Sequence, residues 1–349
     1  MKGKILVIIA GLCIVSCTGG KNRLDCTDII YKERFVQEMN SRAERIGMSH
    51  TTFLNASGLI DENGYLPTST ARDCIKLMLE AMSHPNLMKI WGKATWTMPI
   101  YDASVGDDDI VYLSSSVVDT NHYEADMPRR ELAALIEEYK ILGGKTGTTG
   151  APGILPCSQY FHNLFVVAEK NGKYVIAVLF GADYYGSTYG DKRFSRMKVL
   201  LDNAFGLLNN SNYQTQTVLT EPCGSGLPSP YPCSCAAIEV PTIDLSMLQN
   251  YTPTLLYCEN PDRKVYLAST SKIMTCLLVE EILLPYDKLK YKQIDDIGGS
   301  GNILDNGDIT TVESMMMAAM LPSSNGCAEC LGRVAGKVLL QQENSPKIM

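Results

Sequence analysis

The segment 271–284 constrains the fold of this chain most, because it predicts a helix that is apolar on nearly all sides. Such a helix is normally buried in the middle of a domain. A strand-like segment, 265–268, precedes it, so Ser269 lies at a strand-to-helix junction, close to the free N–H groups and positive field of the helix N-terminus. Lys272 follows by three residues and is expected on the same helix face, within reach of the Ser269 hydroxyl.

Two further motifs lie far from this junction. Ser323 and Asn325 follow a Met-rich predicted helix, 310–321, at a proline where a loop can project side chains. The segment Lys145-Thr146-Gly147 lies where a Gly-rich turn leads towards a sheet, and Gly147 would let a substrate backbone approach closely.

Each motif is weak when taken alone, because the same patterns recur elsewhere in the chain. Ser195 and Lys198 also have Ser-x-x-Lys spacing, but they begin a predicted surface helix with polar partner positions. Ser300 and Asn302 also have Ser-x-Asn spacing, in a turn-rich loop. The context of Ser269 therefore favours it as the nucleophile.

Together the three motifs resemble the Ser-x-x-Lys, Ser-x-Asn and Lys-Thr-Gly set of the penicillin-recognising serine acyl-enzymes. Longer stretches resemble low-molecular-weight penicillin-binding proteins of the D-alanyl-D-alanine carboxypeptidase type; they are FVQEMNSRAERIGMSHTTFLNASGL, STARD, GGKTGTTGAPG, YLASTSKIMT and ITTVESMMMAAMLPSSNGCAECLG. The resemblance covers roughly residues 35–208 and 238–340. It implies an α/β (α+β) fold of the β-lactamase/transpeptidase-like kind, with an antiparallel sheet flanked by helices and a helical subdomain.

The order of the motifs differs from that of the family, in which Lys-Thr-Gly comes last. Here it comes first, so the resemblance implies a circular permutation: 24–208 would be the C-terminal part of the peptidase domain and 236–349 the N-terminal part. The segment 209–235 contains NNSN and GSGLPSPYP without a period and is expected to be a linker. Domain termini usually lie at the surface and often close together, which makes such a permutation physically tolerable. The alternative is a swapped or tandem assembly in which halves of neighbouring chains pair.

The resemblance also implies residue roles. Ser269 would attack the substrate, Lys272 would take its proton, Ser323 would relay that proton to the leaving amine, and Asn325 would hold the network with Lys145. The implied substrate-binding set is Lys145, Thr146, Gly147 and Thr148, and the backbone N–H groups of Ser269 and Thr148 would form the oxyanion hole. Family members frequently have glycine where Ser324 stands here, and often Asp-Ala where Cys327 and Cys330 follow.

The implied activity is a serine-type D-Ala-D-Ala carboxypeptidase that acts on peptidoglycan stem peptides and is inhibited by β-lactams, with no metal or organic cofactor. Two alternatives stay open. One is a β-lactamase of the same fold, for which no carboxylate base can be placed. The other is a non-catalytic cell-wall or β-lactam-binding module, which the intact Ser269, Lys272 and Lys145 argue against.

The first 17 residues predict export. Lys2 and Lys4 precede an apolar run, 5–15, that is too short to span a bilayer, and the run ends in IVSC, which resembles a bacterial lipobox. We therefore expect Cys17 to carry lipid and the chain to be anchored in the bacterial cell envelope, facing the periplasm or the exterior. The alternative is an ordinary signal peptide in which Cys17 has no special role. The net charge of −7 and the lack of a long basic run argue against nucleic acid as a partner.

The cysteines are numerous, 12 in all, and an exported chain permits disulfides of unpredictable connectivity. Cys223, Cys233 and Cys235 could bridge one another or hold a metal, although no histidine or further Cys-x-x-Cys pair beside them favours zinc. Cys327 and Cys330 are expected to pack in the core.

Periodicity and turn residues predict the remaining elements. Helices are expected at 35–46, in a segment that opens at 68–73, at 193–208 and at 327–340; strands are expected at 91–98, 111–113, 163–168 and 173–180. The last two strands should be joined at Asn171-Gly172. The strand around Val265 is expected in the same sheet as 173–180.

Overall fold

The computed structural model describes residues 26–101, 108–150, 160–182, 192–219, 234–241 and 253–345. The predicted lipobox with Cys17, most of the predicted linker, Cys223 and Cys233 lie outside these residues. Mixed helices and antiparallel sheets make up the fold, as the α+β prediction required.

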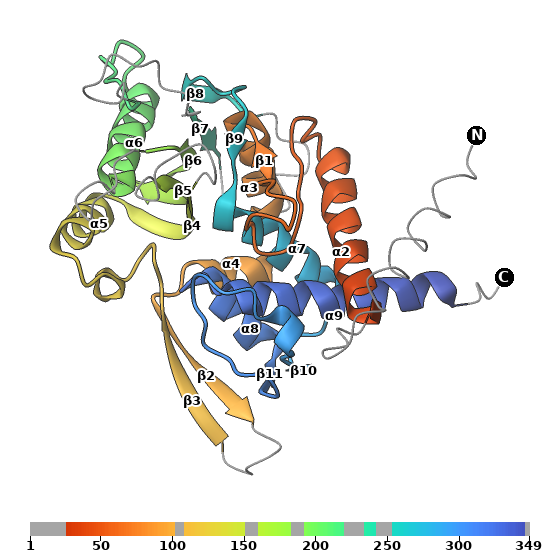
Figure 1. Cartoon of the computed structure of the whole chain (residues 1–349). Coiled ribbons are helices and arrows are strands. Elements are labelled where there is room, and N and C mark those ends of the chain that lie inside the picture. Colours follow the sequence, from red (N-terminus) through yellow and green to blue (C-terminus); the bar gives the residue numbers. More distant parts are fainter. Residues whose placement is uncertain are drawn as a thin grey trace, which may run out of the picture.

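A five-stranded antiparallel sheet is the centre of the molecule (Figure 1). Its order is β4 (Lys140–Gly150), β5 (Tyr160–Lys170), β6 (Lys173–Phe180), β7 (Ser234–Val240) and β8 (Leu255–Glu259). Asn171 and Gly172 join β5 to β6 with φ of 54° and 75°, so the predicted hairpin is confirmed. The strand β4 carries the Lys-Thr-Gly segment at one edge of the sheet.

Both faces of the sheet are apolar and separate two hydrophobic clusters. Along β5, Phe165 and Val167 belong to one cluster, whereas Leu164 and Val166 belong to the other, which is the period-two alternation of a strand. The helices α5 (Asp126–Glu138) and α6 (Arg193–Asn209) contribute to the second cluster.

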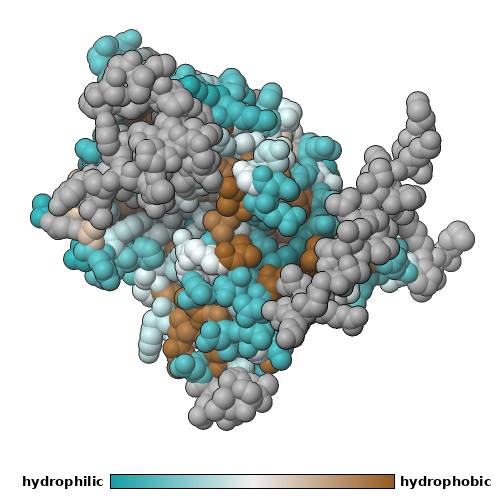
Figure 2. Space-filling view, in the orientation of Figure 1, coloured by the Kyte–Doolittle hydropathy of each residue, from teal (hydrophilic) through white to brown (hydrophobic). Residues whose placement is uncertain are grey.

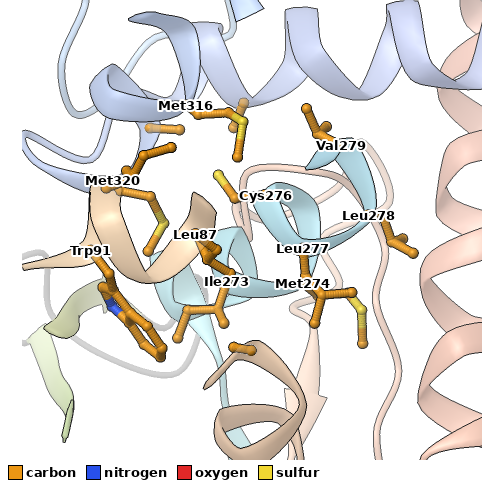
Figure 3. Packing of buried hydrophobic residues seen from close by; sticks show 14 of the residues in the cluster. Leu87, Trp91, Ile273, Met274, Cys276, Leu277, Leu278, Val279, Met316 and Met320 are labelled. Carbon is orange, nitrogen blue, oxygen red and sulfur yellow. The ribbon is translucent and has the colours of Figure 1, made fainter. Parts of the chain in front are cut away.

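The first cluster holds the remaining larger helices around α7 (Lys272–Ile282). They are α2 (Cys26–Arg45), α3 (Ala71–Met82), α4 (Pro85–Trp91), α8 (Val312–Met320) and α9 (Asn325–Asn344). Every residue of α7 from Lys272 to Val279 is buried. Figure 3 shows Cys276 of α7 facing Leu87 of α4 and Met316 of α8, with Met274 and Leu278 on the other side of the helix. The prediction of a central buried helix is confirmed.

Two smaller sheets complete the architecture. One has the order β10 (Lys288–Lys290), β11 (Ile309–Thr311), β2 (Thr95–Tyr101) and β3 (Asp108–Ser114); the other pairs β1 (Thr68–Ser69) with β9 (Val265–Tyr266). The 3₁₀ turns among the described residues are η1 (Thr120–His122), η3 (Ala268–Ser271) and η4 (Gln293–Asp295).

Two element predictions were wrong. Val265 pairs with Ser69 in the small two-stranded ladder and not in the main sheet, whose order runs from β4 to β8 without β9. The predicted strand 91–98 begins only at Thr95. Pro85 at the first helical position starts the short helix α4 there, and Trp91 ends that helix with its side chain buried.

The first and last helices described, α2 and α9, cross closely. A Cβ at Gly336 would lie 1.9 Å from the backbone oxygen of Tyr31, so this crossing needs a glycine. Arg34 of α2 also pairs with Glu343 of α9 at 2.8 Å. The beginning of the described chain therefore lies against its end.

The described surface is mainly hydrophilic in the view of Figure 2, with hydrophobic groups over the centre and near the base of the β2–β3 hairpin. Ile110 and Tyr112 of β3 are among the exposed large side chains. Among the described helices, none combines the length and apolar character needed to cross a membrane.

Candidate active site

Ser269 and Lys272 lie together at the start of α7. The Nζ of Lys272 donates a hydrogen bond to the Oγ of Ser269 at 2.7 Å and another to Oδ1 of Asn325 at 2.7 Å. Lys272 is 0 % exposed and Ser269 is 7 % exposed, so the hydroxyl reaches the edge of the protein while its amine partner is enclosed. This is the spacing that a general base and its nucleophile need.

The turn that presents Ser269 is tightly packed. Ala268 has φ of 49°, which is the left-handed region that non-glycine residues avoid, and such strain recurs at functional sites. A Cβ at Gly58 would lie 1.9 Å from the Ala268 oxygen, and a Cβ at Gly147 would lie 3.1 Å from the Leu267 oxygen. Glycines on both sides therefore allow the loop 55–59 and strand β4 to close on this turn.

Ser323 and Asn325 approach from the other side, at the start of α9. Ser323 also has a left-handed backbone, with φ of 69°, and its Oγ lies 3.4 Å from the Nζ of Lys272. Asn325 is fixed by the loop 298–301, because its Nδ2 donates to the Gly298 oxygen at 2.9 Å and its N–H donates to the Ser300 oxygen at 3.0 Å.

Lys145 closes the group from strand β4. Its Nζ donates to the Oγ of Ser323 at 2.8 Å and to the Thr146 oxygen at 3.0 Å, so both lysines meet at one serine. The Thr146 hydroxyl lies 2.7 Å from the Ser116 hydroxyl. One chain therefore brings the three motifs together, although 178 positions separate Lys145 from Ser323.

Burial disfavours the charged form of both lysines. It lowers the pKa of Lys272 from 10.5 to about 7, although the carboxylate of Glu329 acts in the opposite direction. Burial, the charge of Lys272 and then that of Arg193 hold the pKa of Lys145 well below its usual range. We therefore expect this pair to hold fewer than two protons at neutral pH, which leaves an amine able to accept one.

Thr148 lies further along β4 and is exposed. Its Oγ1 accepts a hydrogen bond from Nη2 of Arg193 at 2.8 Å, and the same guanidinium group lies 2.5 Å from Nδ1 of His162 and donates to the Gly147 oxygen at 3.3 Å. A positive charge thus stands beside Thr148 at the open end of the site.

The alternative motifs do not form comparable arrangements. Ser195 donates to the Lys192 oxygen, while Lys198 pairs with Asp202 at 3.1 Å. Burial lowers the pKa of Lys198, but Asp202 and Glu138 together outweigh this effect and raise it. Ser300, in contrast, does belong to the site, but through its backbone oxygen.

Most of the free cysteines in the described residues are buried. Cys327 and Cys330 are buried and unbridged, as predicted, and Cys235 is buried within β7. In the part of the chain that the structure describes, no group of three or more histidine, cysteine, aspartate or glutamate residues could hold a metal ion.

Sequence reasoning missed several residues of the site. Arg193 was placed only at the start of a helix, and Ser116 and Asn163 carried no recognisable motif. Asn163 donates to the Leu267 oxygen at 3.2 Å and so ties the sheet to the turn before Ser269. The one available signal was an arginine at the first position of a predicted helix, where a positive charge is unfavourable.

Comparison with known proteins agrees with this geometry. A family model described as D-alanyl-D-alanine carboxypeptidase matches residues 31–184, a segment that contains Lys145 to Thr148 but not Ser269. No solved structure matches the chain. Enzymes of the matched family are serine hydrolases of the bacterial cell wall that act on peptidoglycan D-Ala-D-Ala peptides. Over residues 31–184 the chain therefore resembles the D-alanyl-D-alanine carboxypeptidase family.

Proposed function

We propose that Ser269 is the nucleophile of this serine D-Ala-D-Ala carboxypeptidase and that Lys272 is its base. The observation that carries the proposal is the 2.7 Å hydrogen bond between the Lys272 amine and the Ser269 hydroxyl. The lowered pKa of Lys272, about 7, supports it, because a general base works best with a pKa close to the operating pH.

Acylation follows from this arrangement. The Ser269 Oγ attacks the carbonyl carbon of the penultimate D-Ala while its proton passes to Nζ of Lys272. The new ester bond forms, the C–N bond to the terminal D-Ala breaks, and the leaving amine receives a proton through the hydroxyl of Ser323. Ser323 lies between the two lysines, 2.8 Å from Lys145 and 3.4 Å from Lys272, which supports that relay. Water then hydrolyses the ester and releases the shortened peptide.

The terminal carboxylate of the substrate binds at the open end of β4 in this proposal. Lys145 is buried and directed at Ser323, so Arg193 and the hydroxyl of Thr148 are better placed to meet a carboxylate. Thr146 positions the strand through Ser116. The backbone N–H groups of Ser269 and Thr148 would hold the developing oxyanion, at about 3–4 kcal/mol for each donor.

We also propose that the domain is circularly permuted and closes within one chain. The crossing of α2 and α9 supports this, since an ordinary family order would join these two helices and here they hold the described ends of the chain together. The match of the family model to residues 31–184, with Ser269 beyond its end, also agrees with a reversed order of the two parts.

Cys17 is the proposed lipid attachment site, on the strength of the IVSC sequence after a short apolar run. The anchor would hold the enzyme at the bacterial cell envelope, facing the periplasm or the exterior. Mass spectrometry of the mature N-terminus tests this, and an unmodified Cys17 would refute it.

The activity itself is tested with a peptide that ends in D-Ala-D-Ala and with a fluorescent penicillin. We expect stoichiometric release of free D-Ala, covalent labelling by the penicillin, and slow release of the hydrolysed drug. Rapid turnover of the penicillin without release of D-Ala would indicate a β-lactamase, and neither reaction would indicate a binding module.

A further inference from the structure

Glu329 is a buried acid close to the reactive centre that the proposed mechanism does not use. It stands four residues after Asn325 on α9, so the two side chains share one face of the helix. Asn325 contacts Lys272 directly, and Glu329 therefore lies one helical turn further along the same face. The residue is only 4 % exposed.

Two donors hold the Glu329 carboxylate in place. The N–H of Ser57 donates to Oε1 at 3.1 Å, and Nζ of Lys32 lies 3.1 Å from Oε2. Lys32 also donates to the Ile294 oxygen at 2.7 Å, which fixes its ammonium group. Both donors come from the first part of the chain, whereas Glu329 belongs to the last helix. A carboxylate with a donor on each oxygen is arranged as a charged group.

The loop that holds Glu329 also contacts the helix of Lys272. The Thr275 hydroxyl of α7 donates to the Ala56 oxygen at 2.7 Å, and Ala56 is adjacent to Ser57. The carboxylate therefore lies in a short chain of contacts, from α9 through the loop 55–59 to α7, that ends one turn from Lys272.

The two buried lysines of the site differ in whether a carboxylate favours their ammonium form. Among the charged neighbours of Lys272, Glu329 is the acid that favours its ammonium form. For Lys145, burial and then the charges of Lys272 and Arg193 lower the pKa, and no carboxylate is among the groups that oppose this effect.

Besides Lys145, which meets Lys272 at Ser323, the titratable groups that act on Lys272 include two thiols. Burial raises the pKa of both Cys276 on α7 and Cys327 on α9 to about 12, so these neighbours are neutral at physiological pH. The Glu329 carboxylate pairs with Lys32 of α2, and Asp295 of η4 lies 3.9 Å from the amine of that lysine.

We propose that Glu329 is a positioning residue of the acylation site, whose buried carboxylate balances the protonated form of Lys272 from one helical turn beyond Asn325. The inference rests on the proposed role of Lys272 as the base. Lys272 must release its acquired proton to the leaving group and must also be neutral before the next attack. A nearby carboxylate keeps both states accessible near neutral pH, where burial alone would leave only the neutral amine.

Removing the charge has a defined effect on the pH profile. In Glu329→Gln, loss of the carboxylate disfavours the ammonium form of Lys272. In a plot of the penicillin labelling rate against pH, the midpoint of the acidic limb should therefore move to lower pH by on the order of one unit. At pH 6 the labelling rate relative to its own plateau should rise about fivefold. The plateau itself should fall, because an amine of lower pKa is a weaker base.

The test combines labelling with a direct titration of Lys272, followed through its ε-carbon resonance. Glu329→Asp keeps the charge, so the midpoint of the labelling profile and the midpoint of the Lys272 titration should both stay near those of the wild type. Glu33→Gln is the matched control: Glu33 lines the same cavity as Glu329 but is exposed, so solvent screens its charge and neither midpoint should move.

The outcomes separate the inference from the proposed function. If the titration midpoint of Lys272 does not move in Glu329→Gln, the electrostatic role of Glu329 is refuted, whether or not the labelling rate falls. Glu329 would then have a purely structural role. A midpoint that falls in a protein whose Ser269 does not label would support the electrostatic role of Glu329 and reject the proposed function.

Discussion

Replacing Lys272 by methionine should reveal how much stability the fold gives up to keep this lysine buried. The pKa of Lys272 is about 7 in the folded chain against 10.5 for an exposed lysine, so the unfolded chain binds more protons between these two values. The free energy of unfolding of the wild type should therefore rise with pH across this window. Methionine removes the titration while keeping a similar volume.

The magnitude follows from the size of the shift, at about 1.4 kcal/mol for each pKa unit. Between pH 7 and pH 9.5 the wild type should gain about 3 kcal/mol in unfolding free energy relative to Lys272→Met. At pH 7 the Lys272→Met variant should be more stable than the wild type. This gain is reduced by about 1–3 kcal/mol, because Oδ1 of Asn325 and the Ser269 hydroxyl lose their hydrogen-bond donor.

Urea unfolding followed by circular dichroism at both pH values measures this difference. Lys337→Met is the control, because Lys337 is exposed on α9 and the substitution removes a solvated charge. The difference between wild type and Lys272→Met should depend on pH, and that of the control should not. A pH-independent difference for Lys272→Met would refute the claim that burial depresses its pKa.

Three further predictions follow from the geometry. Ser269→Ala should abolish penicillin labelling and Ser195→Ala should retain it; labelling that survives the first change would reject the nucleophile. Gly58→Ala should destabilise the chain by more than about 3 kcal/mol in thermal or urea unfolding, since the new Cβ would meet the Ala268 oxygen. Gly64→Ala is the control: Gly64 has a similar φ but nothing within 4 Å of a new Cβ, so this change should cost about 1 kcal/mol. Equal effects would contradict the packing argument. Proteolysis within 209–235 should leave two fragments that co-elute and still label, and fragments that separate at once would favour a swapped assembly.

The elements that the sequence predicts best are those whose pattern is local. The apolar helix after Ser269, the turn at Asn171-Gly172 and the strand at 163–168 depend on residues close together in the chain, and all three are present. The boundary of the strand near Trp91 was wrong because a proline six residues earlier starts a helix that periodicity alone does not separate from a strand.

The partners within the site depend on distant contacts and could be predicted only in part. A resemblance to known motifs predicted the meeting of Lys145 and Ser323. No pattern places Arg193 beside Thr148, or Glu329 beside Lys32, because each pair is made by elements that approach only after the sheet and helices have packed. The pairing of Val265 was missed because a two-residue ladder has no periodicity to detect.

The most direct test of the central claim is peptide mapping of the penicillin adduct on protein that elutes as a monomer. A single permuted chain that contains the whole site predicts one adduct per monomer, on the peptide that carries Ser269, and none in Lys145→Ala or Ser269→Ala. An adduct on another residue, or labelling confined to a dimer fraction, would contradict a site assembled within one chain.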